Sequence, residues 1–118
     1  MTDKQPTIYY NPTCSKSRQT LDLLIDKGLQ PKIIEYLDNP LSKEEIQQIL
    51  DASDLTARDL LRTTEQIYKD AGMDEESLND EEIIEALSQC PTLLQRPIVI
   101  ANGKAALGRP PENVLKIL

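Results

Sequence analysis

The sequence contains no histidine, tryptophan or phenylalanine, and its four tyrosines are the only aromatic residues. A core formed by this chain must therefore be aliphatic, built from isoleucine, leucine, valine and alanine. At 118 residues the chain is long enough to bury such a core within one domain. The absence of histidine also means that no imidazole can help to lower the pKa of a neighbouring thiol.

Long apolar runs and basic stripes are missing as well. No uninterrupted apolar run approaches the ~20 residues that a membrane-spanning helix needs, and residues 1–6 lack the apolar stretch of a signal peptide. The net charge is −7, which argues against binding to nucleic acid or to an anionic membrane surface. We therefore expect a cytoplasmic protein in which any bound anion is small and is met by local groups.

Cysteine is also scarce. Cys14 and Cys90 are the only two, and they lie far apart in the sequence, so they do not make a disulfide framework. A reducing compartment would keep both as thiols. Cys90 precedes Pro91 at the end of a predicted helix, and we expect an ordinary, partly buried cysteine there. The alternative, that Cys90 resolves an intermediate formed on Cys14, stays open.

The segment around Cys14 predicts a strand, a loop and a helix. A β-branched and aromatic run at residues 7–10 gives way to a turn at residues 11–12, after which apolar residues recur at helical spacing. The helix is expected over residues 15–27, ending at Gly28. Cys14 thus falls in the loop that enters this helix.

Strands are predicted on both sides of a helical middle. A strand at residues 32–36 completes a βαβ unit, whose two strands should be parallel and joined by a right-handed crossover. Strands at residues 97–101 and 104–107 flank Asn102-Gly103, a strong signal for a two-residue hairpin. A last helix is expected over residues 110–118.

The middle of the chain, about residues 41–90, is predicted to hold helices. Ser42 and Asn79 are expected to cap two of them, and Thr56 a short third one that carries Leu60 and Leu61, with Arg58 and Arg62 one turn apart. A fourth is expected over residues 65–71, ending at Gly72. The element order predicts an α/β protein with a thioredoxin-like fold and a helical insertion between its βαβ and ββα halves. We expect one domain over residues 1–118.

Cys14 is the strongest candidate for chemistry. A cysteine is most often a small buried hydrophobe, but this one lies where unpaired backbone N–H groups and the positive end of a helix dipole favour a thiolate and a bound oxyanion. Ser17 stands where a C-x-x-C motif would have its second cysteine. A dithiol cycle within this motif is therefore excluded, and electrons must come from another thiol.

Two of the five arginines are candidate anion-binding residues because of their positions. A single arginine is usually a solvated surface charge, but Arg96 and Arg109 each precede a proline at a strand end that should border the Cys14 loop. The first of these pairs, Arg96-Pro97, is where a thioredoxin-like fold characteristically carries a cis proline. An arginine fork donates two parallel hydrogen bonds to an oxyanion and stabilises charge that develops on it.

Four motifs together resemble the ArsC-type, glutaredoxin-dependent arsenate reductases, and most of all the short YfgD-like members of that family. They are Tyr-Asn-Pro-Thr-Cys-Ser-Lys-Ser-Arg at 10–18, Ala-Arg-Asp-Leu-Leu-Arg at 57–62, Arg-Pro-Ile-Val-Ile at 96–100 and Gly-Arg-Pro-Pro-Glu at 108–112. The resemblance spans essentially the whole chain, with the motifs in register.

The resemblance implies a role for each of these residues. Cys14 matches the cysteine that attacks arsenate, and Arg62, Arg96 and Arg109 match the arginines that bind it. The active-site loop includes Tyr10, Asn11, Ser17 and Arg18. Well-known family members have histidine where this chain has Tyr10, so here the helix terminus and the arginines must stabilise the thiolate.

The resemblance also implies the reaction and its partners. The thiolate forms an arsenocysteine ester, glutathione attacks it, and glutaredoxin reduces the resulting mixed disulfide, releasing arsenite. Glutathione is then a co-substrate, and no bound metal or organic cofactor is expected.

Two alternatives remain. One is a monothiol reductase of another small oxyanion or of glutathione mixed disulfides. The other is an Spx-like regulator that binds RNA polymerase, although such regulators typically carry the C-x-x-C switch that Ser17 removes here.

Overall fold

The two ends of the chain build one four-stranded sheet. In the computed structural model, which describes residues 5–63 and 66–118, the strands are β1 (Thr7–Tyr10), β2 (Lys32–Glu35), β3 (Ile98–Ala101) and β4 (Lys104–Leu107), in the order β2-β1-β3-β4. β1 pairs with β2 in parallel and with β3 in antiparallel orientation. The predicted βαβ unit and C-terminal hairpin therefore share a sheet, which is the thioredoxin-like arrangement.

Local signals place the ends of these elements. Helix α1 (Ser15–Asp26) ends one residue before its predicted limit, and Gly28 follows it with a φ of +81°, a conformation open to glycine at little cost. Asn102 and Gly103 have φ values of 55° and 75°, as a two-residue primed turn between β3 and β4 requires. Both predictions are confirmed.

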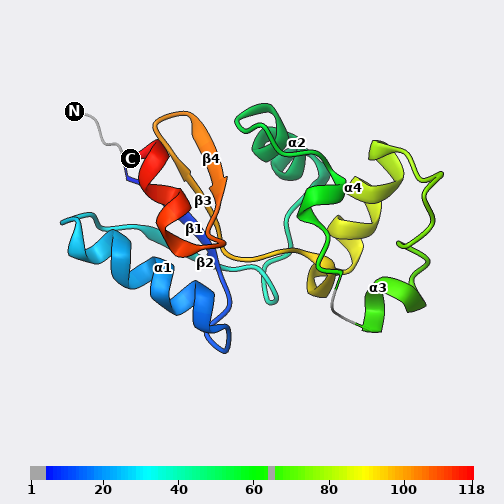
Figure 1. The fold of residues 1–118 in the computed structure, drawn as a ribbon, viewed down its shortest axis with the longest axis horizontal. Helices are drawn as coiled ribbons and strands as arrows, with labels where there is room; N and C mark the ends of the chain where they lie inside the picture. The colour runs from blue at the N-terminus through cyan, green and yellow to red at the C-terminus, as the bar shows by residue number, and fades with distance from the viewer. Residues whose placement is uncertain (1–4, 64–65) are drawn as a thin grey trace. The chain divides into compact units, whose positions relative to one another are not determined.

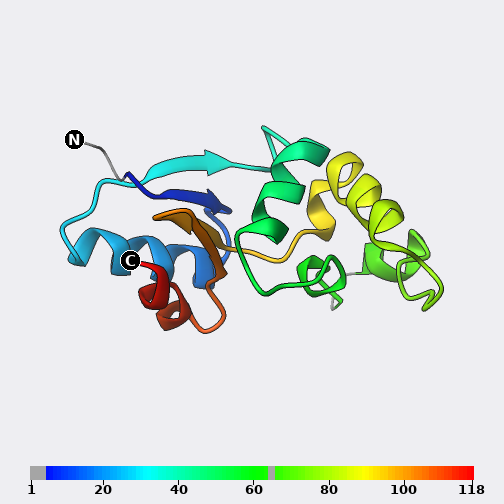
Figure 2. The same cartoon turned by 90° about the horizontal axis from the view of Figure 1, so that it is seen from above.

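An aliphatic core lies on one face of the sheet, beneath α1 and the C-terminal helix η3 (Pro111–Ile117), which pack against each other (Figures 1 and 2). Its buried members are Ile8, Leu24, Val99, Ala101, Val114 and Ile117. Alternate residues of β1 and β3 point to this face, as the two-residue period of a strand requires. The core therefore fixes the register of β1, and with it the position of the loop that follows β1.

The chain divides into two compact units. One comprises the described residues up to Asn39 together with Arg96–Leu118, and the other is Pro40–Gln95. The predicted helical insert, about residues 41–90, lies within the second unit. That the whole chain forms one domain stays a prediction.

The helical unit follows its capping signals. Helices α2 (Lys43–Asp51) and α4 (Asp80–Gln89) pack against each other, and each begins with a complete capping box, Ser42 with Glu45 and Asn79 with Glu82. In each box the side chain of the cap and that of the third helical residue satisfy one another's backbone N–H groups. A 3₁₀ turn, η2 (Pro91–Leu93), follows α4.

The prediction of a helix capped by Thr56 is wrong beyond its first turn. Only a 3₁₀ turn, η1 (Arg58–Leu60), forms there, and Leu61 instead makes an isolated antiparallel bridge with Leu94. The Arg62 N–H donates to the Leu93 carbonyl at 2.7 Å. Pairing with a distant segment thus replaces the local helical hydrogen bonds that the sequence pattern favours.

Smaller differences occur at element ends. Tyr36 and Pro97 fall just outside the strands predicted to include them, and the C-terminal helix is of 3₁₀ type and begins at Pro111. Helix α3 (Gln66–Asp70) ends before Gly72, which has a φ of +74°. Glu65, its predicted first residue, lies outside the described residues. Within the described ranges, no helix is long and apolar enough to cross a membrane.

Candidate active site

The loop between β1 and α1 holds Cys14 at the N-cap of the helix. The Asn11 carbonyl accepts from the Cys14 N–H at 3.0 Å, and Asn11 Oδ1 accepts from the N–H and hydroxyl of Thr13 at 3.0 and 2.8 Å. The Arg18 guanidinium donates to the Pro12 carbonyl at 2.9 Å. The loop is therefore closed by its own hydrogen bonds, which preset the position of the thiol. Cys14 itself is 8% exposed.

Ser17 joins this loop to the first turn of α1. Its side chain is fully buried, and its hydroxyl accepts a hydrogen bond from the Asn11 N–H at 3.3 Å. The residue that replaces the second cysteine of a C-x-x-C motif thus supports the loop and also faces the Cys14 sulfur.

The environment of Cys14 favours its thiolate. Burial raises the pKa of the thiol. Hydrogen bonds lower it by more than burial raises it, so the pKa falls from 9.0 to about 7; the donors are the Ser17 backbone, the Arg96 side chain, the Ser17 hydroxyl and the Lys16 backbone. The two backbone donors belong to the first turn of α1, whose N–H groups have no partner within the helix. The helix terminus and Arg96 therefore lower the pKa in a chain that has no histidine.

Arg96 and Arg109 come together at the Cys14 loop. Arg109 donates through Nε to the Arg96 carbonyl at 2.8 Å, and its Nη2 lies 3.9 Å from Cys14 Sγ. The peptide bonds Arg96–Pro97 and Arg109–Pro110 are both cis, so the predicted cis proline is confirmed and a second one accompanies it. At 3.9 Å, Arg109 contributes little to lowering the pKa of the thiol, but it can reach an oxygen of an anion held on the sulfur.

The remaining predicted residues are Tyr10, which belongs to the sheet unit, and Arg62 and Cys90, which belong to the helical unit. Tyr10 is half-buried and packs against the aliphatic core. Cys90 is a free, half-buried thiol at the end of α4, as expected of an ordinary cysteine. The role of Arg62 in anion binding stays a prediction.

Tyr36 is not among the site residues predicted from the sequence, and the structure brings it to this site. Tyr36 follows β2, is fully buried, and interacts electrostatically with Arg96 and Cys14. Burial raises the pKa of its hydroxyl, against the opposing charge of Arg96, so the side chain is neutral. A signal was present, because β1 and β2 are parallel and the residues that follow parallel strands meet at one edge of the sheet.

This arrangement can attract and attack a small oxyanion. A thiolate lies at a helix N-terminus with guanidinium groups nearby, so the same groups that stabilise the sulfur can neutralise the anion that it attacks. Among residues 5–63 and 66–118, no three His, Cys, Asp or Glu side chains come together as a metal site would require.

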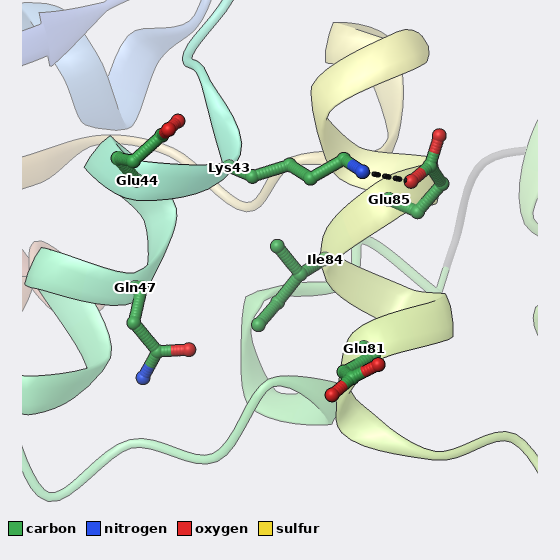
Figure 3. A pocket seen from close by; sticks show the side chains of 6 residues that line it. All are labelled: Lys43, Glu44, Gln47, Glu81, Ile84 and Glu85. Atoms are coloured by element: carbon green, nitrogen blue, oxygen red, sulfur yellow. Dashed lines mark ion pairs between the residues drawn. The ribbon is translucent and has the colours of Figure 1, made fainter.

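A pocket in the helical unit is lined mainly by acidic side chains, in contrast to the arginines at the Cys14 loop. Figure 3 shows Lys43 of α2 reaching to Glu85 of α4, with which it forms an ion pair, and Ile84 pointing between the two helices. Glu44, Glu81 and Gln47 complete the lining. Three carboxylates against one lysine repel an oxyanion, so this pocket is not a candidate anion site.

Comparison with known proteins gives matches over nearly the full chain. A profile described as the ArsC family matches residues 9–117. The arsenate reductase of Haemophilus influenzae is 46% identical over 112 residues, which are 94% of this chain and 97% of that protein. The uncharacterized protein YfgD of Escherichia coli is 45% identical over 116 residues, 98% of each chain. A solved structure, the arsenate reductase from Vibrio cholerae, superposes with a TM-score of 0.94 at 41% identity and covers 99% of this chain and 100% of its own.

Proposed function

This chain belongs to the ArsC family, and from that premise we propose that it is an arsenate reductase in which Cys14 is the nucleophile. The observation that carries the proposal is the Cys14 thiol, whose pKa of about 7 makes about half of it thiolate at neutral pH, 3.9 Å from the Arg109 guanidinium. Relatives called arsenate reductase cover almost all of the chain, which supports the choice of arsenate.

The first step is attack of the Cys14 thiolate on arsenic. A sulfur–arsenic bond forms, one arsenic–oxygen bond breaks, and the oxygen leaves as hydroxide that takes a proton from solvent. Arg96 and Arg109 are proposed to bind the arsenate oxygens and to stabilise the charge that builds up in the transition state. Arg62 is proposed as a third arginine for the anion, on the family resemblance alone.

The second step transfers two electrons. The thiolate of glutathione attacks the Cys14 sulfur, a disulfide forms between them, and the electron pair of the sulfur–arsenic bond passes to arsenic, which leaves as arsenite. Glutaredoxin is then proposed to reduce the Cys14–glutathione disulfide. An external thiol is needed because Ser17 stands where a second cysteine of the motif would be.

The direct test is turnover of arsenate with glutathione and glutaredoxin. Cys14→Ser should abolish arsenite formation, because a hydroxyl has no sulfur to carry the mixed disulfide. Cys90→Ser, the matched control, should keep nearly full activity. Unchanged turnover in Cys14→Ser would overturn the mechanism, and a large loss in a well-folded Cys90→Ser would make Cys90 the resolving thiol.

A second measurement separates the reaction from binding. In a Cys90→Ser background, arsenate should slow alkylation of Cys14, because the anion covers the sulfur. Phosphate has the same shape and charge as arsenate, so it should protect as well. Protection by both anions with no arsenite formation would favour the reduction of another oxyanion or of a mixed disulfide.

A further inference from the structure

The hydroxyl of Tyr36 is buried beside the candidate site. Tyr36 is fully buried, and its hydroxyl oxygen has no hydrogen-bond partner among the residues that the structure describes. The side chains of Arg96 and Asn11 lie near enough to lower its pKa, but neither meets the hydroxyl with hydrogen-bond geometry. A buried hydroxyl that forgoes water and finds no protein partner destabilises the folded chain. Such a group is uncommon in folded proteins and calls for an explanation.

The position of Tyr36 explains why its hydroxyl is left without a partner among the described residues. The residue follows β2, which is parallel to β1, so it lies at the edge of the sheet where the Cys14 loop begins. Its electrostatic partners are Arg96, one of the two arginines at the Cys14 loop, and Cys14, the proposed nucleophile. The phenol is also neutral, so it keeps a proton to donate at the pH at which Cys14 is a thiolate.

We propose that the Tyr36 hydroxyl donates a hydrogen bond to the oxyanion bound at Cys14, and that it acts as a neutral donor beside the arginines. The inference rests on the proposed function, because it needs an anion at this site. Arg96 interacts with both Tyr36 and Cys14, so an anion that its guanidinium holds against the Cys14 sulfur also lies beside the Tyr36 hydroxyl. A neutral donor adds a hydrogen bond to the anion, while the positive charge of the arginines stays available to the thiolate.

The test is Tyr36→Phe, which keeps the ring and removes only the oxygen. Three quantities are measured in the Cys90→Ser background: the melting temperature, the pH midpoint of Cys14 alkylation, and the concentrations of arsenate and of inorganic phosphate that give half-protection. The half-protecting concentrations should rise roughly tenfold or more, as for a lost hydrogen bond to a charged group. The melting temperature should stay the same or rise, because the variant loses an unsatisfied buried hydroxyl. The alkylation midpoint should not change.

The matched control is Tyr68→Phe, which makes the same change on a half-buried tyrosine of α3 in the helical unit. It should leave all three quantities unchanged. Equal anion protection in Tyr36→Phe and its parent would overturn the proposal for Tyr36 and leave the proposed function standing. A lower melting temperature together with weaker protection would assign Tyr36 a structural role and also overturn it. Failure of both anions to protect the parent protein would overturn the anion site itself, and the Tyr36 proposal with it.

Discussion

Ser17 has two roles around Cys14. Its hydroxyl accepts from the Asn11 N–H at 3.3 Å, and both its backbone and its hydroxyl stabilise the Cys14 thiolate. A cysteine at this position would place a second thiol against the first and open a dithiol cycle. Serine keeps the hydrogen bonds and removes that redox chemistry, so the site depends on an external reductant in the proposed reaction.

The pH dependence of Cys14 reactivity follows from these contacts. The thiolate is the reactive form, so the alkylation rate in a Cys90→Ser background should rise with pH through a midpoint near the pKa of about 7. Ser17→Ala removes a hydrogen bond that lowers the pKa, and its midpoint should therefore move to higher pH, with slower alkylation at neutral pH. The measurement is the rate of iodoacetamide labelling against pH. A midpoint that stays in place in Ser17→Ala would mean that the backbone donors and Arg96 suffice.

At the scale of elements, the two arginine-proline segments are joined where β3 begins and β4 ends. The Gly108 N–H donates to the Pro97 carbonyl at 2.9 Å, and Arg109 Nε donates to the Arg96 carbonyl at 2.8 Å. A Cβ on Gly108 would lie 2.7 Å from Thr20 Oγ1 and 2.8 Å from Pro97 Cγ. The absence of a side chain at Gly108 therefore lets this segment approach α1 and places Arg109 near Cys14.

Gly108→Ala is expected to lower stability and to weaken anion binding at Cys14, although Gly108 itself has no side chain to contact the anion. Both close neighbours belong to packed parts of the fold, so the alanine should cost about 1–3 kcal/mol of unfolding free energy, as overpacking of a core does. It should also weaken anion protection of Cys14, because the displaced segment carries Arg109. Urea unfolding and the alkylation assay measure the two effects. Gly28→Ala is a useful comparison, because Gly28 has a positive φ and a Cβ added there would meet nothing within 4 Å. It should therefore destabilise the chain without weakening protection.

At the scale of the whole molecule, the residues discussed for anion binding belong to two compact units. Cys14, Tyr36, Arg96 and Arg109 come from the sheet unit, and Arg58 and Arg62 from the helical unit. The Arg58 guanidinium forms hydrogen bonds within its own unit, donating to the carbonyls of Met73 and Glu75 at 3.0 and 2.9 Å. Of the two arginines in the helical unit, Arg62 is the one with a predicted role in anion binding, and that prediction comes from the family resemblance.

Arg58 and Arg62 form a matched pair for testing that role. Arsenate at 100 times its dissociation constant should stabilise the wild-type chain by about 2.7 kcal/mol, measured as a rise in melting temperature. Arg62→Ala should reduce this rise at the same arsenate concentration. Arg58→Ala should lower the melting temperature without arsenate, because two carbonyls lose their donor, and should leave the rise itself intact. The reverse pattern would give Arg62 a structural role.

The sequence by itself determined the local structure, because local elements depend on residues that are close in the chain. The strand, loop and helix around Cys14, the Asn102-Gly103 turn and the helix caps Ser42 and Asn79 are each specified within a few residues, and each was predicted. Tertiary structure decided what distant segments do to one another. Leu61 leaves its predicted helix to pair with Leu94, Tyr36 is buried beside Arg96, and Arg109 reaches a sulfur 95 residues away in the chain. Such contacts depend on packing between segments. The predicted strand ends indicated that the Arg109 segment borders the Cys14 loop, but only the packed structure decides which atoms meet.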